Sequence, residues 1–170
     1  MFTSLAIALA LGQAAPQPLK VLEAEFYAFD ADDPDRAEAT RIVPYVPETS
    51  CFGWEIRVPP ADRTIRVREV LILPAPPRTW NTDESITTIS TDRRRAETEL
   101  EQDLSEGMLS NDWCIADGDP LGRHRIEVYE GRRLLRRFDF QVVLTVRLPS
   151  ISSTNSGTST LAAPIRVSWK

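Results

Sequence analysis

The sequence predicts an all-β domain, built as an antiparallel β-sandwich, and three observations support this prediction. Apolar and polar residues alternate with a period of two in successive segments, which is the pattern of half-buried strands. The chain has 13 prolines and 7 glycines, and prolines spread along a chain interrupt helices and mark strand ends and loops. Its 170 residues are enough for one domain with a substantial core.

Strand signals begin at residue 19. The segment LKVLEAEFYAF (19–29) ends in the Asp/Pro turn cluster DADDPD. CFGWEIRV (51–58) and TIRVREVLIL (64–73) alternate clearly, and the prolines of PAPP stop the second of them. SITTIS (85–90) is a short strand candidate. The apolar residues expected on one face are Phe52, Trp54, Ile56 and Val58 in the first alternating strand and Ile65, Val67, Leu71 and Leu73 in the second.

Residues 93–109, RRRAETELEQDLSEGML, fit two structures. Leu100, Leu104 and Met108 have helical spacing, whereas acidic residues alternate with less polar ones as in a strand that has one solvated face. We predict a strand because the surrounding segments are strands. The acidic residues of its solvated face are Glu97, Glu99, Glu101 and Asp103.

The stretch ADGDPLGRHRIEVYEGRRLLRRFDFQVV (116–143) predicts a β-hairpin. A three-residue turn at 131–133 would set Ile126 opposite Phe138. That register pairs opposite charges across the strands, whereas the other register brings arginines together. The arginines are therefore interpreted mostly as the charged outer face of a sheet. The residues expected to face inward on the second strand are Leu134, Phe138, Phe140, Val142 and Leu144.

The first residues, MFTSLAIALALGQAAP, predict a secretory signal peptide, because an apolar run is followed by small residues suited to cleavage. The alternative is a buried N-terminal strand or helix. The expected organisation is a signal peptide at 1–15, a sandwich domain at 16–146, and a polar loop with a C-terminal edge strand or tail at 147–170. We therefore expect the protein in the periplasm or outside the cell.

The segments FGWEIRV, LILPAPP and GDPLGRHRIEVYEGRRLLRRFDFQVV resemble an uncharacterised family of bacterial exported domains. The resemblance spans roughly residues 20–145 and implies an immunoglobulin-like β-sandwich of about seven strands. Its motifs are turns and core positions, so they specify a fold and no chemistry. The sequence departs from the family by carrying His124 where an aromatic residue is usual, and by extending past residue 146.

Cys51 and Cys114 are the two cysteines of the chain. In an exported protein two cysteines most simply form one disulfide, and the alternative is a pair of buried thiols. The sandwich topology that the resemblance implies would place the two cysteine-bearing strands in opposite sheets, running in the same direction. The disulfide would then join the two sheets at one end of the sandwich.

Composition and motifs exclude several classes of function. A formal net charge of −5 disfavours nucleic-acid binding, which needs a positive field. No segment after the signal peptide is apolar enough to cross a membrane. The chain lacks G-x-S-x-G, P-loop, G-x-G-x-x-G and H-E-x-x-H motifs and has a single histidine. We therefore assign no catalytic, cofactor-binding or metal-binding residue and no cofactor.

The functional hypothesis is a non-enzymatic exported module that serves an interaction or structural role in the bacterial envelope. Its expected partner is an unknown envelope protein or a glycan, and fold alone does not identify it. The alternative is a carbohydrate-binding or carbohydrate-active sandwich that uses exposed tryptophans and surface carboxylates. Trp80 and Trp113 are the candidate binding surface because both lie outside the predicted strands.

Overall fold

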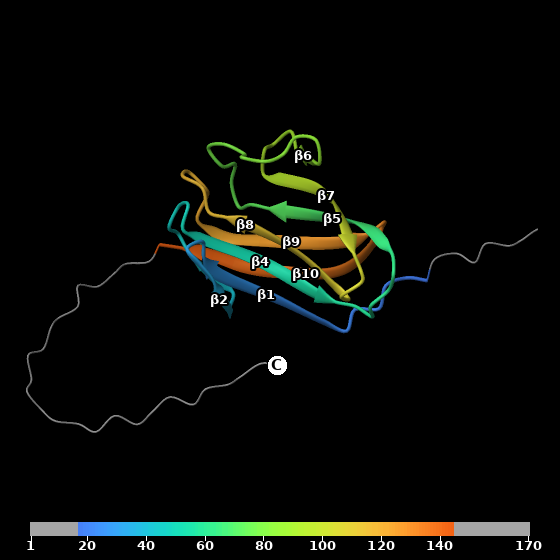
Figure 1. The fold of residues 1–170 in the computed structure, drawn as a ribbon. Coiled ribbons are helices and arrows are strands. Elements are labelled where there is room, and N and C mark those ends of the chain that lie inside the picture. Colours follow the sequence, from blue (N-terminus) through green and yellow to red (C-terminus); the bar gives the residue numbers. More distant parts are fainter. Residues whose placement is uncertain (1–16, 145–170) are drawn as a thin grey trace, which may run out of the picture.

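The computed structural model describes residues 17–144, and ten strands lie in two packed layers (Figure 1). No helix among these residues is long and apolar enough to span a bilayer. One layer is a four-stranded sheet with the order β2-β1-β4-β8. Its strands are β1 (Glu23–Asp30), β2 (Asp33–Ala39), β4 (Ser50–Arg57) and β8 (Met108–Cys114).

The second layer is a six-stranded sheet with the order β3-β10-β9-β5-β7-β6. Its pairings are antiparallel except for β3 on β10, which is parallel. Its strands are β3 (Ile42–Pro44), β5 (Thr64–Ile72), β6 (Thr87–Ile89), β7 (Arg95–Asp103), β9 (Gly122–Glu130) and β10 (Arg133–Val143).

The β-sandwich prediction is confirmed, but ten strands replace the expected seven or so. Strands β2 and β3 were not predicted: β2 is polar and almost wholly exposed, and β3 has three residues. Residues 93–109 are strand rather than helix, as predicted, but they do not form one strand. The chain turns at Gly107, whose φ is +69°, and begins β8, so the segment contributes to both sheets.

Aromatic packing between the sheets fixes how the layers face each other. Phe26 on β1 stacks on Phe140 of β10 with ring centroids 4.6 Å apart. Trp54 on β4 lies parallel to Phe138 of β10 at 6.4 Å. The predicted inward faces of β4 and β5 are confirmed, and the completely or almost completely buried members are Phe52, Trp54, Ile56, Val58, Val67, Leu71 and Leu73.

The predicted hairpin register is confirmed, with Ile126 opposite Phe138. Arg125 contacts Asp139 at 2.7 Å, and Arg137 contacts Glu127 at 2.9 Å. The turn differs from the predicted three-residue turn at 131–133, because Arg133 already pairs with Glu130. The extra residue on β10 forms a bulge between Leu134 and Arg136. The bulge reverses the alternation.

Two residues of the predicted inward face are therefore corrected. Leu134 is 41% exposed, and the next residue, Leu135, packs against the core in its place. Leu144 is 64% exposed because it follows the end of β10. The predicted signal peptide at 1–15 and the predicted loop and edge strand or tail at 147–170 lie outside the described residues.

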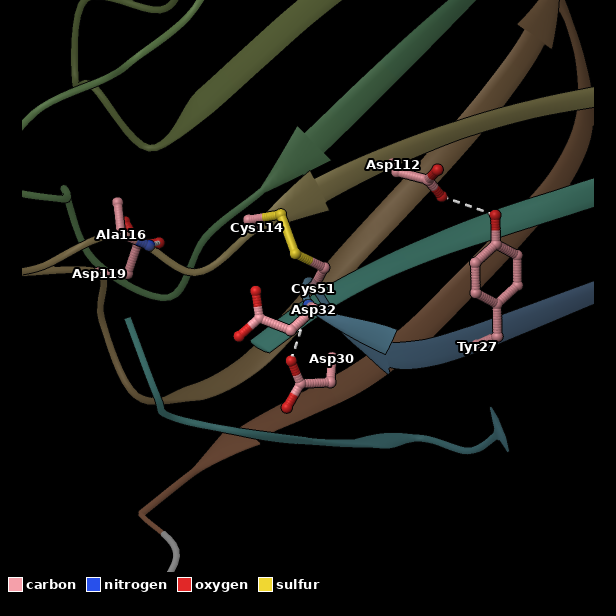
Figure 2. Close-up of a disulfide and its surroundings, with 8 residues drawn as sticks. All are labelled: Tyr27, Asp30, Asp32, Cys51, Asp112, Cys114, Ala116 and Asp119. Atoms are coloured by element: carbon pink, nitrogen blue, oxygen red, sulfur yellow. Dashed lines mark hydrogen bonds between the residues drawn. A yellow bond between two sulfur atoms is a disulfide. The ribbon is translucent and has the colours of Figure 1, made fainter. Parts of the chain in front are cut away.

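The disulfide between Cys51 and Cys114 is present, but its place in the fold corrects the expectation. The two residues face each other on neighbouring antiparallel strands, β4 and β8, of one sheet, with Cα atoms 3.9 Å apart (Figure 2). The expectation was wrong because it did not contain β8, which occupies the place beside β4. The bridge fastens β8 to its sheet and does not join the two layers.

Candidate functional site

A buried glutamate lies in the middle of the sandwich. Glu69 is on β5, between the inward-facing Val67 and Leu71, and its side chain is 0% exposed. Period-two alternation places position 69 on the inward face of this strand. Glu69 was not among the predicted inward-facing residues, because only apolar residues were expected on that face. A charged residue within an otherwise apolar face was the available signal, since buried charges need specific partners.

Three side chains of the opposite sheet surround the Glu69 carboxylate. The indole N–H of Trp54 donates a hydrogen bond to Oε2. The indole N–H of Trp113 donates to Oε1 at 2.6 Å. The Asn111 amide reaches both oxygens, at 3.1 and 3.2 Å. Glu69 therefore links β5 to both β4 and β8.

The electrostatic state of Glu69 reflects two opposing causes. Burial raises the pKa of the Glu69 carboxyl, and this effect is the largest. The N–H donors of Trp54, Trp113 and Asn111 oppose it because they stabilise the ionised form. The nearby Asp112 carboxylate raises the pKa further. The net shift of the Glu69 pKa is upward. The ionised carboxylate is therefore costly in free energy, and only neutral hydrogen-bond donors stabilise it.

A polar row leads from Glu69 to the edge of the six-stranded sheet. Thr98 on β7 pairs with Glu69, and Thr87 on β6 pairs with Thr98. Both threonines are buried, and their hydroxyl oxygens lie 3.1 Å apart, within hydrogen-bond distance. Three neighbouring strands thus carry polar side chains at the same level of the inner face.

The six-stranded sheet extends beyond the four-stranded sheet at this side. Strand β8 lies opposite β5, because Asn111 and Trp113 contact Glu69. Strands β7 and β6 continue past β8, as Figure 1 shows. A groove of about 440 Å³ lies between the edge of β8 and these two strands. Its walls include Asn111 and Trp113 on one side and Ile86, Thr98 and Leu100 on the other.

Strand β8 is the edge of its sheet, and part of that edge is open. The N–H of Ile115 donates to the carbonyl of Ser50 on the β4 side. The antiparallel ladder therefore directs the backbone groups of the even-numbered residues 110, 112 and 114 away from β4. The Ser110 N–H is capped by the side-chain carbonyl of Gln102 at 3.2 Å. The backbone at Asp112 and Cys114 consequently borders the groove.

The outer face of the same strand is held by a hydrogen bond across β4. The Tyr27 hydroxyl on β1 donates to Oδ1 of Asp112 at 2.6 Å (Figure 2). The tyrosine ring passes over Gly53, where a Cβ atom would lie 1.9 Å from the Asp112 oxygen. Glycine at 53 is thus required for this close approach. Burial and the Asp112 carboxylate raise the pKa of Tyr27 well above its usual value.

The structure brings the two candidate tryptophans together. Trp80 and Trp113 meet edge to face with ring centroids 6.5 Å apart. Both are partly buried and pack against the core. The Trp80 indole N–H donates to the carbonyl of Arg93 at 3.0 Å, as that of Trp113 donates to Glu69. A binding role for the pair remains a prediction, and Trp113 is the member that borders the groove.

The acidic residues of β7 lie on the solvated outer face. Glu101 pairs with Arg66 at 2.8 Å, and Glu97 pairs with Arg68 at the same distance. They belong to cross-strand ion pairs between β5 and β7. Among residues 17–144, no three His, Cys, Asp or Glu side chains are grouped so that they could hold a metal ion.

Comparison with known proteins agrees with this architecture. A family model described as the PM0630 beta sandwich domain matches residues 24–143. An immunoglobulin-like protein of Pseudomonas aeruginosa, PA1606, superposes with a TM-score of 0.51 at 18% identity, over 76% of this chain and 100% of that chain. At that identity the likeness shows the fold alone. No curated protein matches the chain.

Proposed function

The chain belongs to the PM0630 β-sandwich family, and from that premise we propose that it is an exported interaction module of the bacterial envelope. We further propose that it takes an extended segment of an envelope protein beside β8. The observation that carries this proposal is the open edge at Asp112 and Cys114, which lies along a groove formed by β6 and β7. A peptide strand added there would continue the four-stranded sheet.

The side chains around the groove suit such a guest strand. Backbone hydrogen bonds to β8 would supply affinity that is independent of sequence, and alternate side chains would enter the groove. Leu100 and Ile86 offer apolar contacts, while Thr98 and Asn111 offer polar ones. Glu69 fixes Asn111 and Trp113 before a partner arrives, which reduces the entropy that binding must overcome.

Two features support export. The apolar run in MFTSLAIALALGQAAP resembles a cleavable leader. The Cys51–Cys114 disulfide suits an oxidising compartment, where such bonds form and persist.

Site-specific photo-crosslinking in the envelope fraction of the source bacterium tests the proposal. A photo-crosslinking amino acid at Ile86, which is 45% exposed in the groove, should capture a partner, and mass spectrometry should place the crosslink in an extended segment. The same amino acid at Leu134, 41% exposed on β10, is the position control. Asp112→Pro should abolish the crosslink, because proline removes the outward N–H of β8. Asp112→Asn keeps that N–H and should retain it.

Three results would contradict strand addition: equal crosslinking from position 134, a crosslink that survives Asp112→Pro, or no crosslink from position 86. The alternative, carbohydrate binding at Trp80 and Trp113, ranks second because both indole N–H groups already have protein acceptors. Recovery of a glycan that is lost on Trp113→Ala but kept by Asp112→Pro would favour that alternative.

A further inference from the structure

A second hollow, of about 590 Å³, lies on the six-stranded sheet away from the β8 groove. It crosses the ends of β3, β10, β9 and β5. The outward-facing residues of β9 and β10 form its floor in register, with Arg123 beside Gln141 and Arg125 beside Asp139. Ile72 of β5 pairs with Arg125 on the other side. The hollow and the groove beside β8 share no lining residue.

The residues that line this hollow carry a strong positive charge. Four arginines contribute to it, and Asp139 is the single acidic residue among them. The local balance is 4 − 1 = +3, within a chain whose formal net charge is −5. The arginines come from three different places in the fold: Arg41 precedes β3, Arg94 precedes β7, and Arg123 and Arg125 are on β9.

Three of the four guanidinium groups are fixed by a single hydrogen bond each to an oxygen at the rim or floor. Arg125 Nε donates to the Asp139 carboxylate at 2.7 Å. Arg41 Nη1 donates to the backbone carbonyl of Asp139 at 3.1 Å. Arg94 Nε donates to the carbonyl of Leu73 at 3.3 Å. Arginine has five N–H donors in a planar fork, so each group retains donors for a ligand after being oriented.

The fourth arginine and the apolar surroundings complete the arrangement. The side chain of Arg123 is exposed and makes no hydrogen bond within the described residues 17–144. Ile42, Ile72 and Pro74 line the hollow between the arginines. Apolar walls lower the local dielectric and so strengthen the attraction between a guanidinium and an anion. Arginine forks match the oxygen geometry of phosphate, to which they bind in a bidentate manner.

We propose that this hollow binds a phosphate-bearing ligand, with Arg94 and Arg123 as its principal contacts and Arg41 and Arg125 as supporting ones. The ligand bears more than one negative charge, because a single monoanion would leave most of the positive charge unmatched. Two sources offer this chemistry: a soluble oligophosphate or phosphorylated glycan, and the headgroups of anionic phospholipids.

Titration of the oxidised full chain tests the proposal. Inorganic tripolyphosphate represents the soluble source and is measured by calorimetry. Vesicles of phosphatidylglycerol, compared with phosphatidylcholine, represent the lipid source and are measured by co-sedimentation. Arg94→Gln with Arg123→Gln should weaken binding about tenfold or more, because it removes charge-assisted hydrogen bonds between guanidinium groups and the ligand. Binding should also weaken as salt concentration rises.

The matched control carries the same change in charge outside the hollow. Arg36→Gln with Arg66→Gln removes two exposed arginines that pair with Asp33 and Glu101, and it should leave binding unchanged within about twofold. Thermal unfolding of each variant checks that the fold is intact. Binding of tripolyphosphate or of phosphatidylglycerol vesicles that is lost only in the first variant supports the proposal and identifies the source. Binding of neither probe, or equal loss in both variants, overturns it.

Discussion

Among single residues, Glu69 is the one whose substitution should lower the free energy of unfolding most clearly. Glu69→Leu relieves the burial of a carboxyl but leaves three donors without an acceptor, and Trp54, which is 0% exposed, cannot turn to water. We expect a loss of about 1–3 kcal/mol in the free energy of unfolding, the usual cost of buried unsatisfied donors. Urea denaturation followed by tryptophan fluorescence measures it.

A matched control for Glu69 lies on the neighbouring strand. Glu99→Leu changes an exposed glutamate of β7 and should alter stability by less than about 0.5 kcal/mol. If Glu69→Leu were as stable as the unchanged protein, the carboxylate would not hold the two sheets together, and the fixed positions of Asn111 and Trp113 would need another cause.

His124 makes stability depend on pH. It is buried on the inner face of β9, its Nδ1 lies 3.0 Å from the Gly122 carbonyl, and it stacks on Phe140. Burial lowers the pKa of His124 in the folded protein below the usual 6.5. The unfolded chain therefore binds the proton first as pH falls, so stability is complete above pH 6.5 and decreases from there toward the folded-state pKa.

The variant His124→Phe isolates this contribution because it keeps an aromatic ring and removes the titration. As pH is lowered from 7.5 to about 5, the unfolding free energy of the unchanged protein should fall relative to that of the variant. Parallel stability curves over that interval would show that His124 titrates alike in the folded and unfolded chains. Guanidinium chloride denaturation at a series of pH values gives the two curves.

Single positions differ in how far the sequence could predict them. Alternation along β5 places residue 69 inward, so the burial of Glu69 was accessible from local pattern. Its partners were not, because Asn111 and Trp113 approach it only through the pairing of β8 with β4. The charges on the two strands did predict the hairpin register, because only one register forms both the Arg125–Asp139 and the Arg137–Glu127 ion pairs.

At the scale of elements, strands with a buried face were predictable and edge strands were not. Strand β4 is buried at six of its eight positions, and the alternating Phe52, Trp54 and Ile56 made it predictable. Strand β2, DPDRAEA, is exposed at six of seven positions, so it lacks the apolar signal on which period-two analysis depends. Strand β8 contains SNDW, and its polar residues instead face the groove and the outer surface. The edge of β8 was not predicted for the same reason that it is open to a partner: its polar residues do not form a buried apolar face.

At the scale of the whole molecule, the two proposed sites depend on contacts between distant segments. The groove needs β8 in one sheet and β6–β7 in the other. The arginine hollow gathers Arg41, Arg94 and Arg123 from segments that are far apart in the sequence. Within the hairpin, the paired arginines form a charged sheet face, as the sequence predicted. The approach of Arg123 to cations from two other segments was not predictable, because no local pattern encodes it.

The disulfide links the stability of the fold to the compartment in which the protein is proposed to act. It closes a loop with a sequence separation of 63, for which the chain-entropy model gives about 4 kcal/mol as an upper value. We expect Cys51→Ser with Cys114→Ser to lose about 2–4 kcal/mol of unfolding free energy, and reduction of the unchanged protein to have a similar effect.

Reductant provides the matched control, because it should leave the double serine variant unaffected. If reduction did not change the denaturation midpoint of the unchanged protein, the disulfide would not restrict the conformations of the unfolded chain. The attachment of β8 to β4 would then depend only on the backbone hydrogen bonds between the two strands. A midpoint that falls on reduction would mean instead that the β8 edge is fully secured only where thiols are oxidised. The groove beside β8 would then be best maintained in the compartment to which the N-terminal segment is proposed to send the chain.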